Sequence, residues 1–137
     1  MPTVRYLLDT NIVSAVVRAP GGRLAERLSA MPRSEFGISI IVACELRYGA
    51  ARKRSPRLSS QLEAVLEGVD ILPLEEEADR HYGEIRTELE RIGRPIGHND
   101  LLIAAHARTL NATLVTHNTG EFARVPGLVI ENWLADT

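Results

Sequence analysis

Three acidic residues and one asparagine stand where apolar segments of the chain end or begin. Asp9 directly follows a strand-sized apolar run, and Glu45 and Asn118 each come a few residues after another such run. Asp100 immediately precedes a run of five apolar residues that has the length of a helix start. In an open α/β sheet, the residues just past the carboxyl ends of parallel strands converge on one crevice. We therefore expect these four side chains to lie together.

The oxygen atoms of these side chains favour one kind of chemistry. Three carboxylates and an amide brought together would make a hard-oxygen site, suited to Mg²⁺ or Mn²⁺. A cation held there would lower the pKa of a bound water molecule. Glu121, one helical turn beyond Asn118, could supply a charge that the amide lacks. No pair of histidines has the helical spacing of zinc ligands, so zinc is not expected.

Each of these residues also has an ordinary structural role that competes with a catalytic one. Asp9 is a good N-cap for the helix that should follow it, and Asp100 would complement the dipole of its helix. Asn118 suits a turn. Glu45 is harder to explain, because a carboxylate in an otherwise apolar stretch needs either a buried ion-pair partner or a cation. For Glu45 we favour the cation.

A cluster of basic residues follows Glu45 in a chain that is otherwise slightly acidic. The members of this basic cluster are Arg47, Arg52, Lys53, Arg54 and Arg57. Lysine and arginine are favoured near the carboxyl ends of helices, so a solvated helix end would explain them. The same charges beside an acidic site could also hold the phosphate backbone of a nucleic acid. The two explanations are compatible.

Length and composition limit the kinds of protein that this chain could be. The 137 residues, 45% of them hydrophobic, suit a single domain spanning residues 1–137. The net charge of -2 argues against a protein that binds nucleic acid through overall positive charge. The single cysteine, Cys44, excludes an internal disulfide and fits a cytoplasmic location. The sequence shows neither a signal peptide nor an apolar stretch long enough to span a membrane, so no membrane association is expected.

The apolar pattern predicts strands and helices in alternation. The expected strands cover residues 4–8, 36–40, 69–72, 112–116 and 128–130. The expected helices cover residues 11–18, 23–30, 41–53, 58–66, 75–92, 99–110 and 119–123. This alternation favours an α/β fold with a mostly parallel central sheet that helices cover on both faces. The helix over residues 75–92 should begin with an acidic first turn, which complements its dipole.

Taken in order, these motifs resemble the PIN-domain nucleases, and specifically the VapC-type toxins of bacterial toxin–antitoxin pairs. The matching stretches are residues 7–12, 39–49, 95–107, 114–122 and 125–128. Four of these stretches contain one each of the candidate residues Asp9, Glu45, Asp100 and Asn118. The resemblance covers nearly the whole chain. It implies a three-layer α/β/α sandwich of the PIN type with a parallel sheet at its centre.

The resemblance also implies a role for each matching residue. Asp9, Glu45 and Asp100 would bind Mg²⁺ or Mn²⁺, and Asn118 stands where many PIN domains have a fourth acid. The supporting groups around these ligands would be Thr10, Asn11, Ser39, Thr116 and Glu121. Either Asn118 or Glu121 would complete the site.

On this basis, the expected activity is that of a metal-dependent endoribonuclease toxin. The protein would hydrolyse phosphodiester bonds of RNA, with transfer or ribosomal RNA as the favoured substrates. A VapB-like antitoxin would neutralise it, since antitoxins of this family typically insert a C-terminal segment, often through an arginine, into the acidic site. The family also implies a homodimer, which could assemble further with the antitoxin.

Two other functions are compatible with parts of the pattern. A phosphohydrolase could use Asp9 as a covalent nucleophile, but that chemistry needs a second acid at the position of Asn11, and the chain is short for such a fold. A non-catalytic binding module could use the acidic pocket only to receive an arginine of a partner. Within the nuclease hypothesis, DNA stays open as a substrate because no motif specifically recognises a 2′-hydroxyl.

Overall fold

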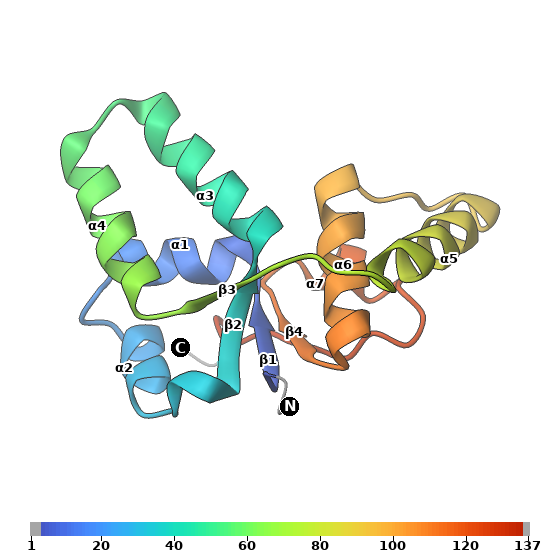
Figure 1. The fold of residues 1–137 in the computed structure, drawn as a ribbon, viewed down its shortest axis with the longest axis horizontal. Helices are drawn as coiled ribbons and strands as arrows, with labels where there is room; N and C mark the ends of the chain where they lie inside the picture. The colour runs from blue at the N-terminus through green and yellow to red at the C-terminus, as the bar shows by residue number, and fades with distance from the viewer. Residues whose placement is uncertain (1–3, 136–137) are drawn as a thin grey trace.

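A five-stranded sheet with helices on both sides forms the framework of the protein (Figure 1). The structure, a computed structural model, describes residues 4–135. The strands are β1 (Tyr6–Leu8), β2 (Phe36–Ser39), β3 (Asp70–Leu72), β4 (Thr113–Val115) and β5 (Ile130–Glu131). All five run parallel, in the order β3–β2–β1–β4–β5. The predicted α/β fold with a central parallel sheet is confirmed.

Helices fill every connection between the strands. They are α1 (Thr10–Arg18), α2 (Arg23–Ser29), the 3₁₀ turn η1 (Arg33–Glu35), α3 (Ile40–Lys53), α4 (Pro56–Glu67), α5 (Ala78–Arg91), α6 (His98–Leu110) and α7 (Thr119–Phe122). Helices α1 to α4 lie in the connections leading out to β3, and α5 to α7 in those leading back to β4 and β5. Because parallel connections are right-handed, the two directions place the two groups on opposite faces (Figure 1). No helix within residues 4–135 is long and apolar enough to cross a membrane.

One predicted helix start is wrong. The helix expected from residue 75 begins at Ala78, so residues 75–77 form no acidic first turn. Glu77 instead has a φ of 82°, in the left-handed region, and its backbone N–H donates to the side chain of Asp79 at 3.1 Å. This local bond competes with the helix and delays its start, which leaves Asp79 as the acid of the first turn. Every other expected element exists, with its ends within two residues of the prediction.

The sheet is buried between the two helix layers. Leu7, Ile38 and Leu114, on three neighbouring strands, are completely buried, as are Ile12 of α1 and Ile103 of α6. A parallel sheet covered on both faces has no polar side, so its strands read as apolar runs rather than as an alternating pattern. The polar residues that follow these runs therefore mark the edge where the buried sheet meets solvent.

The order of the strands places one special point at that edge. From β1 the chain moves outward to β2 and β3, and then returns to the other side of β1 with β4. Ligand crevices of open α/β sheets lie at the carboxyl ends of strands where this direction reverses. Here the reversal falls between β1 and β4, which are followed by Asp9 and Thr116. The backbone N–H of Asp9 donates to the carbonyl of Val115 at 2.9 Å, which holds the two strand ends side by side.

Candidate active site

Asp9 occupies the centre of the candidate site, at the carboxyl end of β1. It is the N-cap of α1, and its Oδ1 accepts a hydrogen bond from the backbone N–H of Thr10 at 2.8 Å. The hydroxyl of Thr116 donates to Oδ2 at 2.7 Å, and Nδ2 of Asn11 donates to the same oxygen at 3.3 Å. Asp9 is only 4% exposed, and burial raises its pKa while these hydrogen bonds oppose that rise. The cap and its neighbours therefore hold the carboxylate at the strand end.

Two of the supporting residues also tie the loop after β4 to the start of α1. Oγ1 of Thr116 accepts a hydrogen bond from the backbone N–H of Asn118 at 2.9 Å. Oδ1 of Asn11 accepts one from the backbone N–H of His117 at 3.0 Å. Both residues thus contact Asp9 and the β4 loop at once. The position of the carboxylate and the path of this loop depend on each other.

Glu45 reaches the site from the second turn of α3. Its Oε1 accepts a short hydrogen bond from the hydroxyl of Thr10, and its Oε2 accepts one from Nδ2 of Asn99 at 3.2 Å. Because Thr10 begins α1 and Asn99 lies in the first turn of α6, Glu45 links three helices. Within residues 4–135, no lysine or arginine pairs with this carboxylate, so a buried ion pair is not what accommodates it.

Asp100, in the first turn of α6, shares a hydrogen bond with Glu121 of α7. Burial and this hydrogen bond raise the pKa of Asp100 to about 7, and the negative charges of Asp9, Glu121 and Glu45 add to the rise. Two carboxyl groups in contact share a proton, because like charges at short distance cannot both form freely. Nδ2 of Asn118 donates to Oε2 of Glu121 at 3.1 Å. Glu121 thus supplies the fourth acid of the cluster, and Asn118 holds it.

A buried polar pair, Ser39 and His106, joins the helices that carry Glu45 and Asp100. Ser39 caps α3, and its Oγ accepts a hydrogen bond from the N–H of Ile41 at 3.1 Å. The same Oγ lies 2.8 Å from Nδ1 of His106 in α6. Ser39 is 0% exposed and His106 is 1% exposed, and burial lowers the pKa of the imidazole. No sequence motif signals this contact, because the two residues are 67 positions apart.

The four carboxylates form a hard-oxygen donor set of the kind that Mg²⁺ and Mn²⁺ prefer. As they lie, no three histidine, cysteine, aspartate or glutamate side chains of residues 4–135 are close enough together to ligate one ion. The acids are bonded instead to protein hydrogen-bond donors and to one another. Burial is the main cause of the raised pKa of Asp100, and the negative charges of Asp9, Glu121 and Glu45 add to it; a divalent cation would offset those charges. By the chemistry of its donors, the cluster fits such an ion once side chains turn away from their present partners.

The structure separates the members of the basic cluster. Arg47 pairs with Glu63 of α4, with Nη2 and Oε1 3.0 Å apart. Arg52 and Lys53, in the last turn of α3, line a cavity beside the acidic site. The two members that lie beyond α3 and outside this cavity are Arg54 and Arg57. Only two of the five members of the basic cluster therefore face this cavity.

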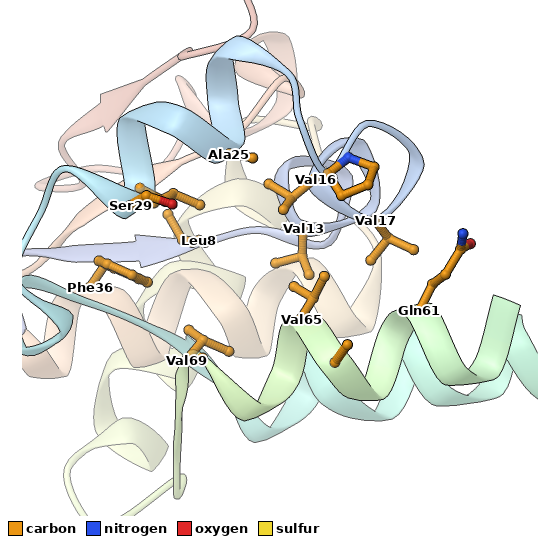
Figure 2. Close-up of a pocket in the computed structure, with 14 residues that line it drawn as sticks. Leu8, Val13, Val16, Val17, Ala25, Ser29, Phe36, Gln61, Val65 and Val69 are labelled. Carbon is orange, nitrogen blue, oxygen red and sulfur yellow. The ribbon is translucent and has the colours of Figure 1, made fainter. Parts of the chain in front are cut away.

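A larger, apolar cavity lies between α1, α2 and α4 (Figure 2). Its volume is about 420 Å³, and none of the predicted site residues lines it. Figure 2 shows Val13 and Val17 of α1 on one side of this cavity and Val65 of α4 on the other. The polar side chains in its lining are Ser29 and Gln61. The protein thus offers two distinct features near α1, an acidic site and an apolar cavity.

Comparisons with known proteins agree with this architecture. A family model described as the PIN domain matches residues 6–128. Ribonuclease VapC2 of Rickettsia felis is 43% identical over 130 residues, which cover 93% of this chain and 97% of that relative. The tRNA(fMet)-specific endonuclease VapC of Shigella flexneri is 37% identical over 131 residues, which cover 95% of this chain and 98% of that relative. The crystal structure of VapBC2 from Rickettsia felis bound to a promoter DNA fragment aligns with a TM-score of 0.86 at 40% identity, covering 93% of this chain and 98% of that one.

Together, the parallel sheet, the acidic site at its switch point and the family match show that the chain belongs to the PIN-domain family. Within that family, the relatives just described, which match it over nearly its whole length, are VapC proteins. The resemblance seen in the sequence motifs is confirmed.

Proposed function

We propose that this protein is a divalent-metal-dependent endoribonuclease of the VapC type, the toxin of a toxin–antitoxin pair. The proposal is carried by the four carboxylates that meet at the switch point of the sheet, Asp9, Glu45, Asp100 and Glu121. RNA is the proposed substrate, and transfer RNA the first class to test, because the relatives bear the names ribonuclease and tRNA(fMet)-specific endonuclease. The proposed location is the cytoplasm, where such substrates occur.

In the proposed reaction, the four acids have different roles. Asp9 is fixed by three hydrogen bonds, so it is the best-placed direct ligand, and Asp100 is the second. When bound, Mg²⁺ or Mn²⁺ supplies a water molecule of lowered pKa and charge stabilisation at the phosphate. Glu45, which Thr10 and Asn99 orient, accepts the proton of the attacking water. Glu121, held by Asn118, completes the negative charge of the site.

A VapB-like antitoxin is the proposed partner. The Rickettsia felis relative was solved as a VapBC2 complex with DNA. The apolar cavity of about 420 Å³ suits an apolar segment of such a partner (Figure 2), and the nearby carboxylates suit a cationic side chain. A partner that occupied the apolar cavity and contacted the carboxylates at the same time would block the acidic site.

The phosphohydrolase alternative finds no support in the structure. Its general acid would stand at Asn11, whose amide is engaged in hydrogen bonds to Asp9 and to the backbone of His117. The N–H of an amide donates hydrogen bonds but is not acidic enough to transfer a proton to a leaving group. A measurement of RNA cleavage distinguishes the nuclease hypothesis from the hypothesis of a non-catalytic binding module.

Cleavage of a panel of labelled transfer and ribosomal RNAs tests the proposal. Purified protein is incubated with Mg²⁺, with Mn²⁺ and with EDTA, beside the variants Asp9→Asn and Glu26→Gln. Glu26 is an exposed acid on α2, away from the site, and serves as the matched control. We expect discrete cuts that need the cation, are lost in Asp9→Asn and persist in Glu26→Gln. Cuts that survive EDTA or Asp9→Asn contradict the metal site. An absence of cutting by folded wild-type protein across the panel favours the binding module.

A further inference from the structure

A second cavity opens directly beside the acidic site, between α1, α3 and α4. Its volume is about 250 Å³; Thr10 and Glu45 line it, and so do three cations, Arg18, Arg52 and Lys53. With a rise of 1.5 Å per helical residue, Lys53 lies about 12 Å along α3 from Glu45. We name this cavity the α1–α3 groove. It runs from Glu45, the one carboxylate in its lining, to a cationic end.

The cations of the α1–α3 groove are available to a ligand. Arg18, Arg52 and Lys53 are all exposed, and no carboxylate of residues 4–135 forms an ion pair with them. Arg47, by contrast, lies outside the groove and forms an ion pair with Glu63. Of the three basic residues within α3, only the two that line the groove, Arg52 and Lys53, are thus without an ion pair to a carboxylate of the described residues.

Helix dipoles explain the individual cations but not their arrangement. Arg18 ends α1, and the other two lie in the last turn of α3, where lysine and arginine are favoured. A helix dipole gives no reason for cations from two different helices to converge on one groove that begins at an acidic site. A nucleic acid strand whose reacting phosphate approaches the carboxylates meets repulsion there, and cations at neighbouring phosphates offset it.

An exposed aromatic ring stands beside the groove. Tyr48, one turn of α3 beyond Glu45, is 66% exposed. The guanidinium of Arg52 lies 5.8 Å from the centre of its ring. Aromatic rings and guanidinium planes stack on unpaired bases, which a single strand presents and a duplex does not. This pair of side chains therefore favours a single-stranded segment.

We infer that the α1–α3 groove is the path of a single-stranded RNA segment that extends from the acidic site, with Arg18 and Lys53 on its phosphates and Tyr48 stacked on a base. The inference rests on the proposed nuclease function and adds to it the route and the single-stranded form of the substrate at the site. Arg18 is isolated in the sequence and was not part of the basic cluster identified there.

Binding of RNA to Asp9→Asn protein tests the path, because that variant leaves the RNA intact. The probes are a fluorescein-labelled, unstructured 12-nucleotide RNA and its duplex. Each probe is titrated with protein in the presence of Mg²⁺, at salt concentrations from 50 to 200 mM. We expect Arg18→Gln with Lys53→Gln to weaken single-strand binding about tenfold. The slope of log affinity against log salt should fall by about 1.4, which corresponds to two phosphate contacts. The matched control, Arg23→Gln with Arg80→Gln, removes the same charge outside the groove and should bind as before.

A second variant tests the stacking surface. Tyr48→Leu should weaken binding of the single strand by about fivefold or more and leave duplex binding unchanged.

Equal losses for the groove variant and its control overturn the path, because they indicate diffuse attraction only. Duplex binding as tight as single-strand binding overturns the single-stranded form.

The outcome for the groove and the outcome for the nuclease are separable. If wild-type protein cleaves RNA and the groove variant, with the site intact, cleaves with unchanged KM, the path is wrong and the nuclease stands. If wild-type protein cleaves no RNA but the groove variant still loses binding of the 12-nucleotide probe, the groove stands and the nuclease is wrong. If the groove variant loses affinity for a co-expressed antitoxin and keeps its affinity for RNA, the groove belongs to the protein partner.

Discussion

The hydroxyl oxygen of Ser39 lies 2.8 Å from Nδ1 of His106. This contact couples α3, which carries Glu45, to α6, which carries Asp100. Ser39 lies six residues before Glu45 on the chain, and His106 lies six residues after Asp100. His106 is also hydrogen-bonded to the backbone of Pro73, which has only a carbonyl to offer. A neutral imidazole that donates there must accept at Nδ1, so the hydroxyl of Ser39 donates to it.

Ser39→Ala should therefore cost more than an ordinary helix cap. The substitution removes the cap of α3 and leaves Nδ1 of His106 buried without a donor. We expect a loss of roughly 2–4 kcal/mol in the free energy of unfolding, measured with urea. Ser55→Ala is the control, because Ser55 caps α4 through the N–H of Leu58 at 3.2 Å and has no buried partner. Its expected cost is about 1 kcal/mol, and equal costs for the two variants would contradict the coupling.

The stability of the protein should fall in mild acid because of His106. Burial lowers the pKa of this imidazole in the folded state from its ordinary value of 6.5. Below pH 6.5 the unfolded chain therefore binds a proton that the folded protein does not bind, and unfolding is favoured. The free energy of unfolding, measured by urea titration from pH 7.5 to pH 5, should decrease more steeply in wild type than in His106→Gln. His117→Gln, at an exposed histidine, should follow wild type.

The acidic cluster should destabilise the metal-free protein at high pH. The pKa of Asp100 rises from 3.8 to about 7 in the folded state. Between these values the folded protein holds more protons than the unfolded chain, so the stability from this group is present at low pH and is lost as the pH rises through 7. Asp100→Asn removes the ionisation, so in EDTA at pH 8 its Tm should exceed that of wild type. At pH 5 the two should differ little. A lower Tm for the variant at pH 8 would contradict a destabilising effect of the ionised, buried Asp100.

The sequence was sufficient for nearly all the elements, and it drew attention to all four acids of the cluster, Glu121 included. Asp9 and Asp100 lie beside short apolar runs, and such local signals depend only on neighbouring residues. The contact between Asp100 and Glu121 could not be predicted from the sequence, because it joins two helices whose packing no local pattern encodes. The same holds for Ser39 and His106. Sequence reasoning placed the residues near the right strands and could not pair them.

The cations show the same limit. Arg47 stands out in the sequence because basic residues follow it, yet in the structure it forms an ion pair with Glu63 of α4 and lies outside the groove. Arg18 has no such neighbours, yet the end of α1 directs it into the groove that begins at Glu45. Which charges a ligand can use is decided by the packing of helices. Composition and spacing do not contain that information.

The bond between Thr10 and Glu45 should contribute to the rate rather than to substrate affinity. The hydroxyl of Thr10 donates to Oε1 of Glu45, whereas its backbone N–H binds Asp9 independently of the side chain. Thr10→Val keeps a side chain of similar size and removes only the donor, so we expect kcat for RNA cleavage to fall about tenfold with KM little changed. Thr10→Ser restores the donor and should recover most of the rate. Because a purely structural role would not distinguish serine from valine in this way, wild-type kcat in Thr10→Val or no recovery in Thr10→Ser would count against the positioning of Glu45 by this hydroxyl.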